Sequence, residues 1–125
     1  MRKLVVTLAA TAFLASPAIA GDAAKGAKVY KKCVSCHMIG DKAKNRVGPQ
    51  LNGIIGRDIA SLADYKYSKG MTAYAEKEKA WNEENLAAYL ANPRKTVKGT
   101  RMAFAGLRKQ KDRDNVIAYL KENAK

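Results

Sequence analysis

Apolar residues recur at helical spacing in four short stretches of this 125-residue chain. The spacing predicts helices over residues 23–32, 68–78, 82–92 and 111–123. Asp22 and Asn82 are suited to cap the first and the third of these helices, and Pro93 cannot continue the third. No stretch alternates between apolar and polar residues as a half-buried strand does. The pattern therefore predicts an all-α fold.

Two irregular segments separate the predicted helices. Residues 40–56 and residues 95–107 are each interrupted by glycines, and Pro49 lies in the first of them. The chain has no internal repeat, no low-complexity tract and no obvious linker. We therefore expect a single domain.

The first 20 residues look like a targeting segment and not like part of the fold. Arg2 and Lys3 precede an apolar stretch, and Ala18-Ile19-Ala20 offers a cleavage site for signal peptidase. The apolar stretch is too short and too interrupted to span a bilayer comfortably, although an uncleaved membrane anchor is the alternative. Residues 1–20 are thus predicted to be a cleaved secretory signal peptide. Residues 21–125 would be the mature domain, exported to a bacterial periplasm.

Cys33-Val34-Ser35-Cys36-His37 is a C-x-x-C-H run, which is the attachment sequence of a c-type haem. Two thiols three positions apart on one helical turn can each add to a vinyl group of the same porphyrin. The next residue then presents an imidazole to the iron. The predicted cofactor is one covalent haem c per chain, with Cys33 and Cys36 as thioethers and His37 as an axial ligand. Such a haem would also support a small domain whose own core is thin.

Three other interpretations of the two cysteines are a thioredoxin-like dithiol, a zinc site and a structural disulfide. A closed zinc site needs four protein ligands, and Cys33, Cys36 and His37 are the only cysteine and histidine residues in the chain. A thioredoxin-like dithiol would lie in a βαβ unit, of which the sequence shows no sign. Haem attachment is therefore favoured.

The chain is strongly basic, with 24 lysine and arginine residues, 11 aspartate and glutamate residues and a net charge of +13. Loss of Arg2 and Lys3 with the signal peptide would leave 22 basic residues and a net charge of +11. A field of this sign speeds the encounter with acidic proteins or membrane surfaces in a salt-dependent way. Nucleic acid is a poor partner for an exported protein. The alternative is that the excess of lysine only maintains solubility.

A haem iron with one histidine ligand has a sixth position, whose occupant decides the function. The chain has no second histidine, which leaves methionine, lysine, tyrosine, water or nothing. Met38 directly follows His37 and so lies on the wrong side of the ring, and Met71 falls in a predicted helix, where methionine is usually part of the core. Met102 lies on an irregular segment that can fold over the far face of the haem. Its position favours it as the ligand.

The mature sequence resembles the class I c-type cytochromes, in particular the cytochrome c2 and mitochondrial-like cytochrome c branch. The resemblance rests on residues 21–26, the C-x-x-C-H run, residues 47–53, Gly56-Arg57, residues 86–93 and residues 99–106. It implies a small single-domain cytochrome c fold, in which the N- and C-terminal helices pack together around the haem. Gly26 and Tyr30 stand where the family packs its first helix against Val116 and Tyr119 of the last.

The resemblance also implies which residues form the haem site. The carbonyl of Pro49 would hold the N–H of His37, and Arg57, Tyr67 and Trp81 would donate to the haem propionates, which are costly to bury unpaired. The implied haem-binding residues are Cys33, Cys36, Pro49, Arg57, Tyr67, Trp81, Tyr89, Thr100 and Phe104, with His37 and Met102 as iron ligands. From the residues alone, Trp81 and Tyr89 would be interpreted as core aromatics.

Three departures from the mitochondrial pattern point to a bacterial, c2-like protein. The segment between Tyr67 and Trp81 is longer, no asparagine stands at the buried polar position expected there, and Met71 falls near it. Lys98 takes a place where the mitochondrial family often has proline, so the methionine loop is expected to be looser.

The resemblance implies electron transfer and not catalysis, because two strong-field ligands leave no iron position for a substrate. We expect a soluble, monomeric periplasmic carrier of one electron that is not an enzyme. It would pass electrons from a bc1-type complex to a photosynthetic reaction centre or a terminal oxidase, with only transient contact with the membrane surface. The expected docking residues are Lys31, Lys32, Lys42, Lys44, Arg46, Arg94, Lys95, Lys98, Arg101, Arg108 and Lys109.

Two other functions stay open at this point. A dedicated redox subunit of one periplasmic oxidoreductase would need a large apolar patch for its permanent partner. A haem enzyme or gas-binding protein would have an open distal position, with Met102 only packed beside it. Peroxidase-like chemistry would also want a distal histidine, which the chain lacks.

Overall fold

The computed structural model describes Ala12 and residues 21–125. This part contains the helices α1 (Ala23–Tyr30), α2 (Lys69–Glu78), α3 (Glu83–Ala91), α4 (Pro93–Thr96) and α5 (Gln110–Asn123). It contains no strand beyond an isolated bridge between Asp58 and Ala80, so the all-α prediction is confirmed. No helix in the described residues has the length and apolar character needed to cross a membrane. Apart from Ala12, the predicted signal peptide of residues 1–20 lies outside the described residues.

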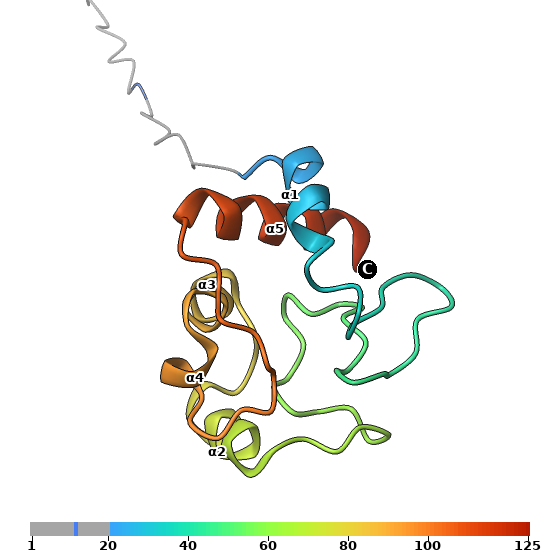
Figure 1. The fold of residues 1–125 in the computed structure, drawn as a ribbon, viewed down its shortest axis with the longest axis vertical. Helices are drawn as coiled ribbons and strands as arrows, with labels where there is room; N and C mark the ends of the chain where they lie inside the picture. The colour runs from blue at the N-terminus through green and yellow to red at the C-terminus, as the bar shows by residue number, and fades with distance from the viewer. Residues whose placement is uncertain (1–11, 13–20) are drawn as a thin grey trace, which may run out of the picture.

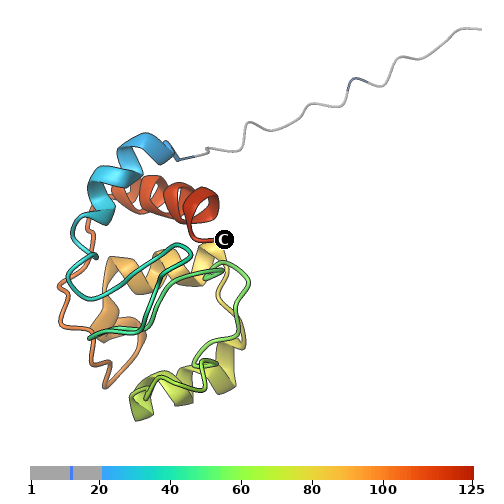
Figure 2. The same cartoon turned by 90° about the vertical axis from the view of Figure 1, so that its right-hand side faces the viewer.

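The helices form two groups at opposite ends of the molecule. α1 and α5 lie against each other at one end, α2 lies at the other end, and α3 and α4 lie between them (Figures 1 and 2). The long segment from α1 to α2 winds along the side of the molecule and has no regular structure apart from turns (Figure 1). Loops therefore contribute much of the wall of the domain.

Side-chain caps begin three helices where the sequence predicts them. Asp22 and Ser68 each accept a hydrogen bond from the backbone N–H three residues further on. Asn82 and Asn85 exchange two bonds of 2.8 Å in a reciprocal capping box. The four predicted helices are confirmed to within one or two residues at each end.

The short helix α4 departs from the prediction, because it extends into a segment expected to be irregular. The side chain of Asn92 accepts a 3.1 Å bond from the backbone N–H of Lys95 and so caps a new turn. Pro93 fills the first position of that turn, where a backbone N–H would have no helical partner anyway. The residue that ends α3 thus begins α4.

The most extensive contact between helices joins α1 to α5. A Cβ atom on Gly26 would collide with the backbone carbonyl of Asn115, so the absence of a side chain lets the helices approach. The N–H of Asp22 donates a 2.8 Å bond to the side chain of Asn115. The rings of Tyr30 and Tyr119 lie 5.1 Å apart between centroids. The predicted packing of the first helix on the last is confirmed.

Gly26→Ala should lower the free energy of unfolding by about 2 kcal/mol, because the new methyl group pushes the two helices apart. Alanine is otherwise a better helix former by about 1 kcal/mol, so propensity alone predicts the opposite sign. Denaturant unfolding of the purified protein measures the effect. The control Lys28→Ala, on the exposed side of α1, should change stability by less than about 0.5 kcal/mol. A neutral or stabilising Gly26→Ala would contradict the close helix contact.

Candidate functional site

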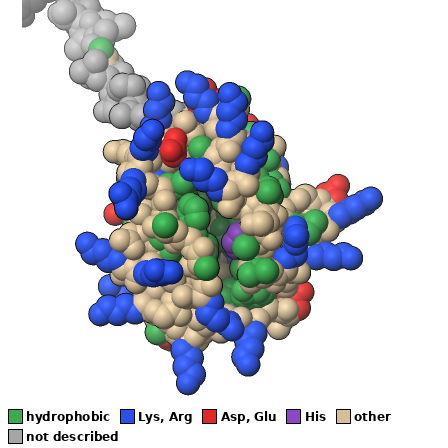
Figure 3. All heavy atoms as spheres, viewed as in Figure 1, with side chains coloured by type: hydrophobic (Ala, Val, Ile, Leu, Met, Phe, Trp, Pro, Cys, Tyr) green, Lys and Arg blue, Asp and Glu red, His purple; other side chains and the backbone are tan. Residues whose placement is uncertain are grey.

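Side chains from both ends of the molecule surround one apolar cavity. Its wall includes Leu51, Ile54, Leu86, Leu90, Leu107, Val116 and Leu120. The buried aromatic residues Tyr30, Trp81 and Tyr89 line the same space, so most of the hydrophobic core is also the wall of the cavity. Figure 3 shows the cavity as a hollow in one face, with the histidine side chain inside it. Such a space is suited to a large, mostly apolar ligand.

Cys33 and Cys36 line the cavity from the turn that follows α1. The backbone N–H groups of Cys36 and His37 both donate to the carbonyl of Cys33, at 3.1 and 2.9 Å, which holds the turn. Both cysteines are half-buried free thiols, so they do not form the disulfide considered as an alternative. Burial raises the pKa of the Cys33 thiol, Cys36 raises it further, and Lys32 opposes the shift. The turn thus brings two thiols and an imidazole to one cavity.

The ring of His37 is held by one of its two nitrogen atoms. Nδ1 lies 2.7 Å from the carbonyl oxygen of Pro49, so Nδ1–H donates and Nε2 keeps its lone pair. Gly48 lies against the ring, where a Cβ atom would collide with it. Burial lowers the pKa of His37 although the Pro49 carbonyl opposes this, and the charge of Arg57 lowers it further. His37 is therefore a neutral imidazole at neutral pH, able to bind a metal ion through Nε2.

Met102 reaches the same cavity from the irregular segment between α4 and α5. Its N–H donates to the hydroxyl of Thr100 at 3.3 Å, and its carbonyl accepts a 2.9 Å bond from the N–H of Phe104. The hydroxyl groups of Thr100 and Tyr89 lie 2.7 Å apart, which ties this segment to α3. Thr100, Phe104 and Tyr89 also line the cavity, so the predicted methionine loop and its predicted neighbour lie together.

Two further methionines lie in residues 21–125. Met38 does not line the cavity, whereas Met71, in the first turn of α2, does. Met71 is half-buried and packs against the core. Of the two methionines at the cavity, only Met102 is carried by a loop.

Tyr67 and Trp81 line the cavity as donors whose protons have no acceptor in the described residues. The Tyr67 hydroxyl accepts a 3.2 Å bond from the N–H of Leu62, which leaves its own proton available. The indole N–H of the buried Trp81 makes no hydrogen bond within residues 21–125. The Trp81 ring stacks between Tyr74 and Tyr89, with centroid distances of 5.8 and 5.4 Å.

Arg57 does not line the cavity, unlike the other predicted haem-binding residues. Its Nη1 donates to the carbonyl groups of Gln50 and Asn52 at 2.9 and 3.1 Å. Its Nε is buried without a partner in the described residues. Burial lowers the pKa of Arg57. Arg57 thus has one buried donor that lacks an acceptor.

The residues present fit a haem c. The wall is apolar, two free thiols lie in one turn, and an imidazole nitrogen and a thioether are available at the same cavity. Buried donors of Tyr30 and Arg57 have no partner in the described residues, and the Tyr67 hydroxyl keeps its own proton available, which is the arrangement that buried carboxylates need. No group of three or more His, Cys, Asp or Glu side chains in the described part of the chain could hold a metal ion by itself.

The hydroxyl of Tyr30 is a feature of the cavity that the sequence pattern does not reveal. Tyr30 is only 6% exposed, lines the cavity, and its hydroxyl has no partner in the described residues. Burial, with smaller effects of Cys33 and Tyr119, raises the pKa of Tyr30 to about 12. The available signal is its position at the end of α1, three residues before Cys33.

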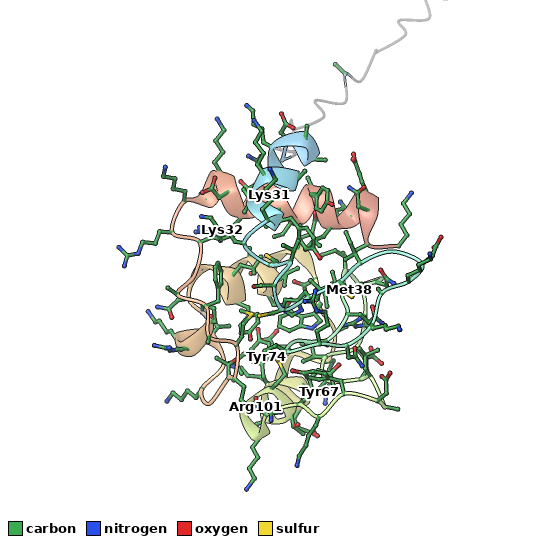
Figure 4. All side chains as sticks on the ribbon, turned by 45° about the vertical axis from the view of Figure 1, so that its right-hand side comes forward. Lys31, Lys32, Met38, Tyr67, Tyr74 and Arg101 are labelled. Atoms are coloured by element: carbon green, nitrogen blue, oxygen red, sulfur yellow. The ribbon has the colours of Figure 1, made fainter. Side chains whose placement is uncertain are left out.

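The predicted docking residues are all exposed. Lys31 and Lys32 lie on the side of α1, and Arg101 lies toward the end formed by α2 (Figure 4). Two of the arginines are bonded back to the protein: Arg46 donates to the carbonyl of Val34 at 3.2 Å, and Arg101 donates to the carbonyl of Lys66. Basic side chains surround the hollow in Figure 3, where few acidic ones are visible.

In comparisons with known proteins, the chain matches members of one protein family. The Cytochrome c family model matches residues 23–124. Cytochrome c2 of Afifella marina is 50% identical over 98 residues, which cover 78% of this chain and 79% of that protein. Cytochrome c2 of Blastochloris viridis is 41% identical over 122 residues, covering 98% and 94%. The solved structure of cytochrome cH from Methylobacterium extorquens superimposes with a TM-score of 0.74 at 39% identity and covers 82% of this chain and 99% of its own.

Tyr30→Phe should reduce the loss of stability at alkaline pH. The pKa of Tyr30 is about 12 in the folded protein against 10.0 for an ordinary tyrosine, so folding holds its proton more tightly. The resulting stability is complete below pH 10 and is lost as the pH rises through 12; a pKa difference of 2 corresponds to about 2.7 kcal/mol. Denaturant unfolding at pH 7 and at pH 11 should show about 1.4 kcal/mol of this loss, because pH 11 lies midway between the two pKa values. An equal loss of stability in Tyr30→Phe and in the wild type would contradict the raised pKa of Tyr30.

Proposed function

The chain belongs to the cytochrome c family, and from this premise we propose that His37 and Met102 bind the iron of its haem c, which Cys33 and Cys36 attach. The protein is an electron carrier and not an enzyme. The observation that supports the proposal is the meeting of these four side chains at one cavity, although Met102 lies far from the others in the sequence. We take residues 1–20 as its signal peptide and residues 21–125 as the domain that carries the haem.

A haem with two axial ligands supplies reversible exchange of one electron and leaves no iron position for a substrate. The surrounding residues hold that arrangement. The Pro49 carbonyl orients the His37 ring and makes it a stronger ligand. The bond between Tyr89 and Thr100 steadies the loop that carries Met102. The aliphatic wall excludes water, so little solvent has to reorganise when the charge changes.

The donors without acceptors would bind the propionate groups. Tyr67 and Trp81 line the cavity and would donate to them directly. Arg57 does not line the cavity, so its Nε would reach a propionate only where that group extends beyond the apolar wall. Its positive charge would still favour the ionised form of a nearby carboxylate.

The basic residues around the hollow would form the docking surface for acidic redox proteins. The one ion pair in the described residues joins Lys121 to Glu83, neither of which belongs to the predicted docking set. The charges of the docking surface are therefore not paired by neighbouring carboxylates. Val34 and Val47 are the exposed large hydrophobic residues of the described part, with 46% and 76% exposure. Such a small apolar area suits a transient complex steered by charge more than a permanent one.

The physiological role follows from the relatives as a further part of the proposal. The bacterial relatives include cytochromes c2, and the N-terminal segment has the pattern of an export signal. The protein would work in the periplasm, taking electrons from a bc1-type complex. It would deliver them to a photosynthetic reaction centre or a terminal oxidase, in a photosynthetic or respiratory chain.

Met102→Ala should leave the haem attached but open the sixth iron position. The ferric protein should lose its sulfur-to-iron charge-transfer band, and cyanide should bind at least about tenfold more tightly because it no longer has to displace a ligand. Optical spectra and a cyanide titration measure both effects. Met71→Ala is the matched control, since Met71 also lines the cavity, and it should keep the band. An unchanged spectrum in Met102→Ala would exclude Met102 from the iron site.

Lys32→Glu should slow the reaction with an acidic redox partner several-fold at low ionic strength, and the difference should vanish in high salt. Lys32 is exposed and lines the mouth of the cavity. Lys77→Glu is the matched control, because it changes the net charge equally on an exposed part of α2 outside the cavity. Stopped-flow kinetics compare the two variants. Equal slowing would mean that only net charge matters and that there is no defined docking surface.

A further inference from the structure

Residues 64–70 contact the loop that precedes Pro49 through two side-chain bonds. The hydroxyl of Tyr65 donates a 2.8 Å bond to the carbonyl of Val47. The side chain of Asn45 donates to the carbonyl of Asp64 at 3.3 Å. Two residues after Val47, the Pro49 carbonyl accepts the bond from His37. Residues 64–70 are thus connected to the loop that orients the histidine ligand.

The same short segment also contacts the loop that carries Met102. The guanidinium group of Arg101, the residue directly before Met102, donates to the backbone carbonyl of Lys66. At Gly70, a Cβ atom would collide with the carbonyl of Lys98, so the two backbones lie in direct contact. Figure 4 shows Arg101 and Tyr67 together at the end of the molecule formed by α2. The segment therefore touches both the loop that orients His37 and the loop that carries Met102.

We infer that residues 64–70 act as a strap that couples these two loops and holds Met102 at the iron, with Tyr65 and Arg101 as positioning residues. The inference rests on the proposed ligation by His37 and Met102. Releasing either end of the strap should let Met102 leave the iron more often. The haem would stay attached, because Cys33 and Cys36 lie in the turn after α1, which the strap does not contact through a side-chain bond.

The methionine loop needs such external support. Few of its backbone groups bond to one another: Thr100 N–H to Val97 at 3.1 Å and Phe104 N–H to Met102 at 2.9 Å. Gly99 has a φ of +77° and Gly106 a φ of +111°, conformations that glycine adopts without cost but that add freedom to the unbound loop. Segments with few internal bonds open with little free energy unless other parts hold them. The carbonyl of Lys98, which stands where proline would stiffen the loop, lies against Gly70.

Imidazole binding to the ferric holoprotein tests the strap, because imidazole binds only when Met102 has left the iron. Its apparent affinity therefore reports the open fraction. Arg101→Ala removes a charge-assisted bond and should raise this affinity about tenfold. Tyr65→Phe keeps the ring and the bond from Asn45 to Asp64, so it releases that end only in part and should raise the affinity about threefold. Lys66→Ala is the matched control: it removes an exposed positive charge, keeps the carbonyl that accepts from Arg101, and should stay within about twofold of the wild type.

The double variant Tyr65→Phe/Arg101→Ala distinguishes a strap from two separate anchors. A strap acts only while both ends are held, so the double variant should bind imidazole about as tightly as Arg101→Ala alone. Independent anchors would multiply to about thirtyfold, which would overturn the inference. A wild-type affinity in Tyr65→Phe together with a raised one in Arg101→Ala would also overturn it, because Arg101 would then act only locally.

Met102→Ala in the same titration separates this inference from the proposed function. If Met102→Ala binds imidazole much more tightly than the wild type but Tyr65→Phe and Arg101→Ala do not, the strap fails and the ligation stands. If Met102→Ala and the wild type bind equally, the ligation itself fails and the strap fails with it. Amide hydrogen exchange of residues 98–104 gives a second readout, and it should be faster in Tyr65→Phe than in Lys66→Ala.

Discussion

The fold depends on filling an apolar space that its own side chains surround. Residues that would form a solid core in another small domain, such as Trp81, Leu86 and Val116, line this cavity instead. An empty apolar cavity lowers stability, because its lining loses contacts that a close-packed core would make. A haem c restores those contacts, and its covalent attachment means that the folded protein cannot lose it by dissociation. The cofactor is thus part of the hydrophobic core.

This constraint explains why the helices need so little contact with one another. α1 packs on α5, and α3 contacts α4 and α5, whereas α2 makes no extensive contact with another helix in the described residues. α2 is held through the ends of loops: Ser68 caps it, and Gly70 in its first turn lies against the methionine loop. The structure is therefore a connected set of four helices, with α2 set apart from them and held through loops.

The sequence predicts features that depend on neighbours along the chain and misses those that depend on distant ones. Asp22, Ser68 and Asn82 reveal the starts of helices because a cap and its helix are adjacent. The C-x-x-C-H run reveals the haem attachment for the same reason. By contrast, the bond from Tyr65 to Val47 and the bond from Arg101 to Lys66 cross 18 and 35 positions, and no local pattern announces them.

Family resemblance extends the prediction to distant residues, but it gives a type of residue and not its orientation. Tyr67 and Trp81 line the cavity as expected, whereas Arg57 is bonded to the carbonyl groups of Gln50 and Asn52 and does not reach the wall. Resemblance also suggested a loose methionine loop from Lys98, because proline is the usual residue there. The structure adds a contact that the resemblance does not reveal: the backbone of Gly70 lies against the carbonyl of Lys98, which depends on the absence of a side chain at position 70.

Exposure alone does not make the basic residues of the docking surface equivalent. Lys32 and Arg101 both lie at the mouth of the cavity and both add to the long-range field that attracts an acidic partner. The guanidinium group of Arg101 already donates to the carbonyl of Lys66, so a partner carboxylate would have to share or displace that bond. Lys32 has no such bond within the described residues and can turn its ammonium group toward a partner. If the proposed docking surface is correct, Lys32 is therefore better suited than Arg101 to close contact with a partner, whereas Arg101 is already bonded within the protein.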